Sequence, residues 1–332
     1  MFRRGVLILL AVVVIAATTV SYLIFGEVRV AGPVPASLVV KKGANVHQIA
    51  DDLGRQGLIR SKALFRLLAR WGNVDRRILP GRYDFAGPVT MYRILRNLYE
   101  QKRMMVKLIF PEGWRVRKFA RLLEERVGVP ADGIIALCRD TELLAKWQIP
   151  AGTAEGYLMP AAYEFYWGIE PADVLDELIS GTQKIFDDSL RARMAETGWN
   201  EHQVLTMASL IEAEIMRAEE RPRVSAVFHN RLKLGMKLQC DPTVIYALGW
   251  PGRPLLYRDL KYDSPYNTYL YPGLPPGPIC NPGKSAILAA LYPTLSDELY
   301  FVARGDGTHV FSKTLDEHNR ARKYVKRLRG QS

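Results

Sequence analysis

The chain opens with an uninterrupted run of apolar and small uncharged residues. Residues 6–25, VLILLAVVVIAATTVSYLIF, are 20 positions without a charge, enough helix to cross a bilayer core of about 30 Å. Arg3 and Arg4 precede the run, so the positive-inside rule predicts residues 1–5 in the cytoplasm and the rest of the chain outside. The run is longer than the apolar core of a signal peptide and continues into FGEVRV without a cleavage site. This favours a single uncleaved transmembrane helix over a signal peptide.

A strand–turn–helix pattern occurs twice after a short linker at residues 31–37. It appears in VVKKGANVHQIADDLGRQGLI (39–59) and returns in IFPEGWRVRKFARLLEERVGV (109–129). The matched positions are Gly43 and Gly113, Val46 and Val116, Ile49 and Phe119, Ala50 and Ala120, and Leu53 and Leu123. The repeat predicts a domain at 36–100 and a second or connecting βα unit at 104–150, and both resemble the LysM-like glycan-binding module. Two copies of a common packing unit without a ligand are the alternative.

Beyond about residue 150, helical patterns mix with short strands and turn-rich segments. An amphipathic helix is predicted over about 172–197, and a later helix ends at Gly235 as its C-cap. SAILAAL (285–291) predicts a short helix, LYFVA (299–303) a strand, and the segment after them a basic terminal helix. Helices and strands do not alternate in a βαβ rhythm, which predicts an α+β fold with a further domain at 151–328.

One predicted helix, within LTMASLIEAEIMRAEERP (205–222), is apolar on every side. Asn200 is its predicted N-cap, Gln203 completes a capping box, and Pro222 limits its extent. The surrounding apolar positions are Val204, Leu205, Met207, Leu210, Ile211, Ile215 and Met216. Such a helix belongs inside a protein. Its two carboxylates, Glu212 and Glu214, therefore need an explanation.

Length and charge narrow the class of protein. A chain of 332 residues with 48% hydrophobic content can bury the cores of two or three domains. A net charge of +12 and a pI of about 9.6 suit nucleic acid, anionic lipid or an anionic cell-envelope polymer. Arginine runs interleaved with aromatics are missing and the anchor exports the chain, so we expect membrane lipid and envelope polymer as partners and no nucleic acid.

The sequence offers little support for disulfide or metal chemistry. Cys138, Cys240 and Cys280 are too few and scattered for a disulfide framework, and three buried thiols are favoured over one Cys240–Cys280 bridge. The chain has no CxxC, HExxH, G-x-S-x-G or P-loop, and its five histidines are dispersed. We therefore expect no metal and no cofactor, and polar chemistry from carboxylates, amides and tyrosines.

Glu212 is the candidate for acid chemistry. On a helical wheel it lies among Leu205, Ala208 and Ile215, so burial should raise its pKa and keep it protonated, as a general acid requires. Glu214 lies about 160° away around the helix, so the two carboxylates cannot act on one substrate atom. We expect Glu214 to be a structural partner, for example of a nearby arginine, or an accessory acid. A purely structural pairing of Glu212 is the alternative.

The loop SPYNTYLYPGLPPGPICNPG (264–283) combines tyrosine rings with asparagine amides on a proline-stiffened backbone. Flat amphipathic rings and amides suit a sugar-binding cleft, because sugars present apolar faces and hydroxyl edges. We therefore predict that Tyr266, Asn267 and Tyr269 contact substrate. A rigid surface loop without a ligand is the alternative.

A set of long motifs resembles the MltG/YceG family of membrane-anchored endolytic murein transglycosylases. In order they are IFPEGWRVRKFA, EGYLMP with YEF, MASLIEAE, VFHNRLKLGMKLQCDPTVIYALG, the loop at 264–283, and YFVARGDGTHVFSKTLDEHN. The sequence departs from the family pattern at Ala161-Ala162, where Asp-Thr is expected, and at Cys240, where Thr is usual. Neither departure affects the candidate acid.

The resemblance implies a transglycosylase domain at 151–328 with Glu212 as the catalytic acid. Glu155, Tyr157 and Asp241 lie in the matching motifs, and we expect them to contact substrate. The expected reaction cleaves the MurNAc–GlcNAc bond of nascent strands, forms 1,6-anhydro-MurNAc ends and limits strand length. The expected location is the inner membrane with the catalytic domain in the periplasm, and peptidoglycan synthases are candidate partners.

Two other classes of function remain open from the residues alone. A lysozyme-type hydrolase would need a second carboxylate, for which Asp241 is the nearest candidate in sequence. A non-catalytic membrane scaffold would bind peptidoglycan through the repeat, and Glu212 would then be structural.

Overall fold

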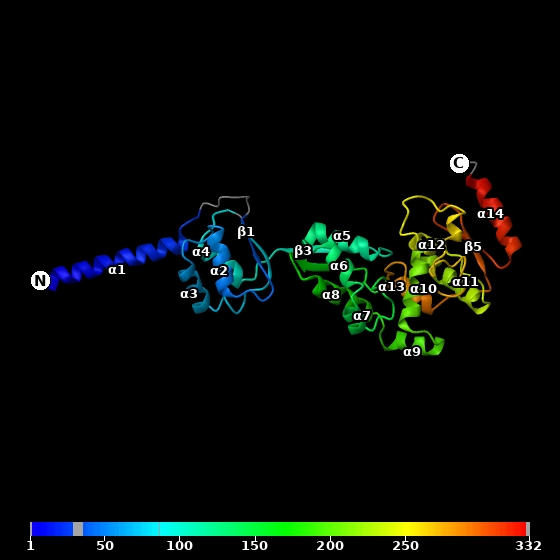
Figure 1. Cartoon of the computed structure of the whole chain (residues 1–332), viewed down its shortest axis with the longest axis horizontal. Coiled ribbons are helices and arrows are strands. Elements are labelled where there is room, and N and C mark those ends of the chain that lie inside the picture. Colours follow the sequence, from blue (N-terminus) through cyan, green and yellow to red (C-terminus); the bar gives the residue numbers. More distant parts are fainter. Residues whose placement is uncertain (1, 29–35, 86, 330–332) are drawn as a thin grey trace. The chain divides into compact units, whose positions relative to one another are not determined.

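The computed structural model of the chain describes residues 2–28, 36–85 and 87–329 (Figure 1). Contacts divide it into a first unit, made of Met1–Leu108, Glu125–Val129 and Glu164–Glu170, and a second unit containing the remainder. Helices and three two-stranded sheets share these units, which confirms the mixed α+β class. The second unit groups Ile109–Glu124 and Pro130–Tyr163 with the later chain, whereas the sequence suggested a boundary near 151.

The first helix, α1 (Phe2–Phe25), contains the predicted apolar run. Its segment Arg3–Phe25 is long and apolar enough to cross a membrane, and its side chains are not buried by the described protein. An exposed apolar helix of this length is what the sequence predicted for an anchor.

A small α/β cluster follows in the first unit. Its elements are β1 (Ala36–Val40), α2 (Val46–Arg55), α3 (Lys62–Trp71), β2 (Gly81–Phe85) and α4 (Met91–Tyr99). β1 and β2 pair antiparallel with Ala36 opposite Phe85, and α2 begins with a capping box between Asn45 and Gln48. The largest buried side chains are Leu38, Ile49, Leu53, Phe65, Tyr83, Phe85 and Met91.

The second copy of the repeat consists of β3 (Met105–Ile109) and α5 (Val116–Val127). Both matched glycines have left-handed backbones, with φ of 77° at Gly43 and 74° at Gly113, and each lies three residues before its helix. The strand–turn–helix repeat is therefore confirmed, while its LysM-like character stays a prediction. β3 pairs with β4 (Ala162–Tyr166), which follows α6 (Ala131–Leu137) and α7 (Thr141–Lys146).

The single helix predicted over about 172–197 is wrong, because the chain forms two helices there. These are α8 (Pro171–Gln183) and α9 (Asp188–Thr197). Asp187 caps α9 by accepting a hydrogen bond from the Leu190 amide, and Gly198 ends it with a φ of 71°. A capping aspartate inside an apparently continuous pattern is thus the signal for the break.

The centre of the second unit is α10 (Glu201–Glu214), which contacts α11 (Arg221–Lys233), α12 (Asp241–Ala247) and α13 (Lys284–Leu291) (Figure 1). The predicted capping box of Asn200 and Gln203 is present. The helix stops at Glu214, so the expected extension toward Pro222 is wrong: Ile215 is extended and Met216 is exposed. The next residues are mostly charged and offer no apolar side to bury, so continuing the helix would gain little.

The remaining elements close the second unit. Short 3₁₀ helices span Ala218–Glu220 and Asp259–Lys261. β5 (Tyr300–Ala303) pairs antiparallel with β6 (His309–Ser312), and the basic terminal helix is α14 (Leu315–Arg329). α11 ends as predicted, with a φ of 63° at Gly235.

Candidate active site

Glu212 lies in the last turn of α10 with a side chain that is only 6% exposed. Its Oε1 accepts a hydrogen bond from Arg221 Nη2 at 2.7 Å, and its Oε2 accepts one from the Gly283 amide at 3.0 Å. Arg221 is the first residue of α11, and Gly283 is the N-cap of α13. Two helix starts therefore supply the two donors to this carboxyl.

The environment of Glu212 contains opposing electrostatic effects. Burial raises its pKa, and the nearby Glu112 carboxylate acts in the same direction. The Gly283 amide and the Arg221 guanidinium act against burial, but the pKa stays above the ordinary value. The predicted direction is confirmed.

Arg221 joins two carboxylates. Its guanidinium is 8% exposed, and Nη2 donates to Glu112 Oε2 at 3.1 Å as well as to Glu212. A Cβ atom added to Gly283 would collide with the Glu112 carboxyl, the flexible end of a half-exposed side chain, so a larger residue here would displace Glu112. Glu112, half-exposed, is thereby held beside the buried acid.

Asn281 connects the loop before Gly283 to two other segments. Its Oδ1 accepts hydrogen bonds from the Gly156 and Leu158 amides, and its Nδ2 donates to Trp114 O and Glu155 Oε1. It is completely buried. These bonds fix the loop that presents the Gly283 amide to Glu212.

Glu155 is a second buried acid in this network. It accepts hydrogen bonds from the Val116 amide and from Asn281 Nδ2. Burial raises its pKa to about 8, although both hydrogen bonds and Arg115 act in the opposite direction. Near neutral pH this carboxyl is largely protonated.

Glu212 opens onto a cavity of about 570 Å³. The lining includes four cationic residues, Arg115, Arg117, Lys118 and Arg121. It also includes Pro242, Ile245 and Tyr246 of α12, Gly249 and Trp250 just after that helix, and Gly113, Ala213, Ile279 and Cys280. Trp250 is 57% exposed and has a φ of 67°, which is strained for a bulky residue. Acidic, cationic and aromatic groups therefore meet in one cavity.

Glu214 has different neighbours from Glu212. Burial raises the pKa of Glu214 to about 7. The Cys240 thiol and the Asp241 backbone amide bond to the carboxyl and oppose this rise, and so does the charge of Arg231. It is not among the residues that line the cavity around Glu212. Arg231 is the nearby arginine whose charge acts on Glu214, whereas Arg221 pairs with Glu212.

The predicted residues of the 264–283 loop separate into two groups. Asn267 is fully buried: its Nδ2 donates to Leu260 O and Tyr262 O, and its Oδ1 accepts from the Tyr269 amide. Its amide thus holds its own loop together and presents no free group to a sugar. Tyr266 is half-buried and packs on Tyr246, with ring centroids 4.8 Å apart.

Tyr266 and Glu155 line a neighbouring cavity of about 530 Å³ that shares Arg115, Arg117 and Tyr246 with the cavity of Glu212. The shared lining makes this space a candidate continuation of the site. The role of Tyr266 and Glu155 in substrate binding stays a prediction.

The other predicted substrate residues lie elsewhere in the unit. Tyr269 donates its hydroxyl proton to Asp241 Oδ1, and neither residue lines the cavity of Glu212. Tyr157 is buried and its hydroxyl is 2.7 Å from His202 Nδ1, beside a third cavity. None of these three residues lines the cavity of Glu212.

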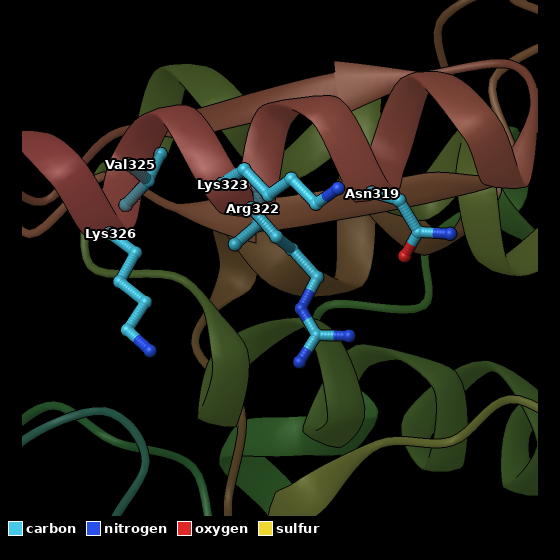
Figure 2. A pocket seen from close by; sticks show the side chains of 6 residues that line it. Asn319, Arg322, Lys323, Val325 and Lys326 are labelled. Carbon is cyan, nitrogen blue, oxygen red and sulfur yellow. The ribbon is translucent and has the colours of Figure 1, made fainter.

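A basic cavity of about 580 Å³ runs along α14 (Figure 2). Figure 2 shows Asn319, Arg322, Lys323 and Lys326 projecting from this helix, and Val302 of β5 completes the lining with Val325. The lining contains no carboxyl group and no tyrosine, so it offers no proton donor comparable to Glu212.

The cysteines Cys138, Cys240 and Cys280 are buried free thiols, as the sequence favoured. In the described part of the chain, no group of three or more histidine, cysteine or carboxylate side chains is arranged to hold a metal ion.

Sequence reasoning missed most of the partners of Glu212. Arg221 lies nine residues beyond Glu212, within the stretch 205–222, whereas Glu112 and Gly283 are distant in sequence and only the folded chain brings them to the acid. Glu112 lies in the motif IFPEGW and Gly283 in the motif ICNPG. Their place inside long motifs was the only sequence signal that they could belong to the site.

Comparison with known proteins identifies relatives over most of the chain. The YceG-like family profile matches residues 38–324. A Bacillus subtilis (strain 168) protein named endolytic murein transglycosylase is 33% identical over 305 residues, covering 86% of this chain and 84% of that protein. A protein of the same name from Streptococcus pneumoniae R6 is 27% identical over 85% of this chain, which spans 56% of that longer protein.

The fold is also shared with a solved structure. A crystal structure of a yceG-like protein from Listeria monocytogenes aligns with a TM-score of 0.61 and 32% sequence identity, covering 86% of this chain and 98% of the other. Since the family profile and these relatives extend over nearly all of the chain beyond its first helix, the chain belongs to the YceG-like family.

Proposed function

We propose that the chain is an endolytic murein transglycosylase in which Glu212 is the catalytic acid. The observation that carries this proposal is the buried Glu212 carboxyl with a raised pKa, open to a cavity lined by aromatic and cationic groups. The activity is the one named for its Bacillus and Streptococcus relatives.

In the first half of the reaction, protonated Glu212 gives its proton to the glycosidic oxygen as the bond from C1 of N-acetylmuramic acid breaks. In the second half, the C6 hydroxyl of the same sugar attacks C1, and the Glu212 carboxylate takes the hydroxyl proton. The products are a 1,6-anhydro-muramyl end and a new free hydroxyl on the departing sugar. No water is consumed, and the intramolecular attack depends on positioning more than on a second carboxylate.

Arg221 and Gly283 have a defined role in this sequence. Both already donate to Glu212, at 2.7 and 3.0 Å, so the carboxylate formed after the first proton transfer meets fixed donors without rearrangement. Burial favours the protonated form that starts the reaction. Burial therefore favours the protonated acid of the first step, and the two donors stabilise the carboxylate of the second step.

The test is mass spectrometry of isolated peptidoglycan digested by the full-length protein in detergent. We expect anhydro-muramyl ends from the wild type and a loss of about 10²–10⁴ in rate for Glu212→Gln, because an amide cannot deliver the proton. Glu214→Gln is the matched control, and it should lower the melting temperature more than the turnover of folded protein. Near-wild-type cleavage by Glu212→Gln would exclude this residue from the mechanism.

A hydrolase is the second candidate, because Glu112 lies beside Glu212 across Arg221. A hydrolase needs a carboxylate to activate water or to act as nucleophile. Neither Glu112 nor Asp241 lines the cavity, but Glu112 suits that role better because it shares Arg221 with Glu212, whereas Asp241 accepts a hydrogen bond from Tyr269. Reducing muramyl ends in the same digest would support hydrolysis, and anhydro ends would exclude it.

The anchor and the N-terminal repeat complete the proposal. We infer that α1 crosses the inner membrane with residues 1–5 in the cytoplasm and the catalytic domain in the periplasm, near the synthases that extrude nascent strands. The strand–helix–helix–strand order of β1 to β2 supports a LysM-like glycan-binding role for this unit. A soluble form lacking residues 1–29 should cut isolated peptidoglycan yet fail to restore strand length in cells lacking the protein.

A further inference from the structure

The cavity of Glu212 has a row of cations that the acid chemistry does not use. Arg117, Lys118 and Arg121 lie on one side of α5, at the spacing i, i+1 and i+4, and Arg115 precedes the helix. The opposite side of α5 is the buried one, with Phe119, Ala120 and Leu123 fully buried. The helix therefore presents three positive side chains to the cavity, and Arg115 adds a fourth.

These charges are not neutralised by the described protein. None of the four residues forms an ion pair with a carboxylate of the described residues. Arg115 instead lies over the Trp250 ring at 4.9 Å and over the Tyr246 ring at 5.7 Å, and Lys118 lies 5.5 Å from the Trp114 ring. A cation over an aromatic face keeps its full charge, so this charge is available to whatever occupies the cavity.

The four cations are not the groups that set the pKa of Glu212. The groups that alter the proton affinity of Glu212 are Gly283, Arg221 and Glu112, together with burial, and the four cations are not among them. Their function is thus to be sought in the ligand.

The facing wall fits a sugar. Tyr246 and Trp250 provide flat aromatic surface, and Trp250 keeps a left-handed backbone that is strained for a bulky side chain. Such strain persists where the surrounding structure needs the residue in place. A glycan lying on these rings would have the cationic row along its other edge.

Resting on the proposed function, we propose that the cationic row selects glycan strands whose muramic acid residues still carry their stem peptides, by binding the peptide carboxylates. In a peptide-bearing strand the lactyl carboxyl of each muramic acid is bound as an amide, so the sugars are neutral and the anions near the row are the carboxylates of the stem peptide. Arginine and carboxylate form charge-assisted, often bidentate hydrogen bonds, and lysine adds a point charge. A strand stripped of its peptides keeps only one lactyl carboxylate per muramic acid, held close to the ring, and is then the poorer substrate.

The experiment compares two substrates prepared from the same uncross-linked strands, one with stem peptides and one stripped by an amidase. Neither carries a lipid pyrophosphate, so the difference reports on the peptide carboxylates set against the single lactyl carboxylate that the amidase releases. For the full-length wild type in detergent we expect kcat/KM to be at least about tenfold higher on peptide-bearing strands, a ratio that falls as salt is added. In Arg117→Gln/Arg121→Gln the ratio should fall toward one.

The matched control is Arg322→Gln/Lys326→Gln, which removes the same charge from the cavity along α14 (Figure 2). It should keep the wild-type ratio. Equal wild-type rates on the two substrates, an unchanged ratio in the α5 variant, or an equal fall in the control would each overturn the proposal. The comparison of wild-type rates on the two substrates needs no variant, so it tests the proposal even where a substitution prevents folding. Failure of the wild type to cut either substrate would instead overturn the proposed transglycosylase function.

Discussion

Replacing Arg221 should separate the two effects that act on Glu212. In Arg221→Gln the carboxyl loses the donor at 2.7 Å that opposes burial, while the Gly283 amide and the buried surroundings remain. The proton should be held more tightly, so the acid form should persist to higher pH. We therefore expect the alkaline limb of kcat/KM to move upward.

The size of the effect follows from the kind of bond removed. A hydrogen bond to a charged group contributes about 1.5–3 kcal/mol, and about 1.4 kcal/mol corresponds to one pH unit. Because the Arg221 guanidinium is 8% exposed and the Glu212 side chain 6%, solvent screens this pair little. The alkaline limb should move by about one pH unit or more, and the plateau rate should fall roughly 10–100-fold because the carboxylate formed in the reaction loses a donor.

The assay is the rate of anhydro-end formation between pH 5 and 9, with the fold checked by thermal melting. Glu112→Gln gives a prediction of opposite sign, since the Glu112 charge raises the pKa of Glu212. Its alkaline limb should move downward, by less, because Glu112 is half-exposed. Arg223→Gln removes the same charge two residues further along α11, where it pairs with Glu298, and should leave the limb in place.

Three results would refute this reasoning. One is an unchanged or lowered alkaline limb in folded Arg221→Gln. Another is a shift of the same sign in Arg221→Gln and Glu112→Gln. The third is an equal shift in Arg223→Gln, which would make the effect one of overall charge.

Three further predictions concern the residues around the acid. Gly283→Ala should displace Glu112 and slow glycan cleavage while the melting temperature changes little; wild-type rates would contradict the packing observed there. Asn267→Ala should lower stability by about 2–4 kcal/mol in denaturant unfolding, since it loses three hydrogen bonds, and a loss of cleavage without destabilisation would restore its sugar-binding role. Burial raises the pKa of Glu155 from 4.5 to about 8, so the folded state holds a proton that the unfolded state releases. Stability should fall as pH rises from about 5 to 8 by up to about 1.4 kcal/mol per pH unit, and Glu155→Gln should flatten that dependence in melting experiments.

The sequence predicted the elements that a local pattern defines. The all-round apolar helix, its capping box at Asn200 and the repeated glycine turns follow from side chains close in sequence, so they could be read without the fold. The same local logic predicted the direction of the Glu212 pKa, because its helical neighbours are enough to bury it. The break before Asp187 was missed since the apolar periodicity continues through it.

The predictions for loop residues depended on the direction of their side chains, which the sequence does not give. Asn267 and Tyr269 have the chemistry of sugar-binding residues, but one amide is used within its own loop and one hydroxyl by Asp241. Composition gives the chemical type of a side chain and leaves its direction undetermined. Trp250 and Arg115 were overlooked for the complementary reason: only tertiary contacts bring them to the cavity of Glu212.

A carboxyl that must first give a proton and then accept one cannot stand in an environment that strongly favours either form. Burial alone would hold the proton on Glu212, and two donors alone would hold it off. The structure combines both, with Glu112 adding negative charge through the same arginine that donates to the acid. Helix α10 supplies the burial, and the starts of α11 and α13 supply the donors, which is why an apolar helix carries this glutamate. A change at any of these distant positions should therefore alter the pH dependence of cleavage before it alters the fold.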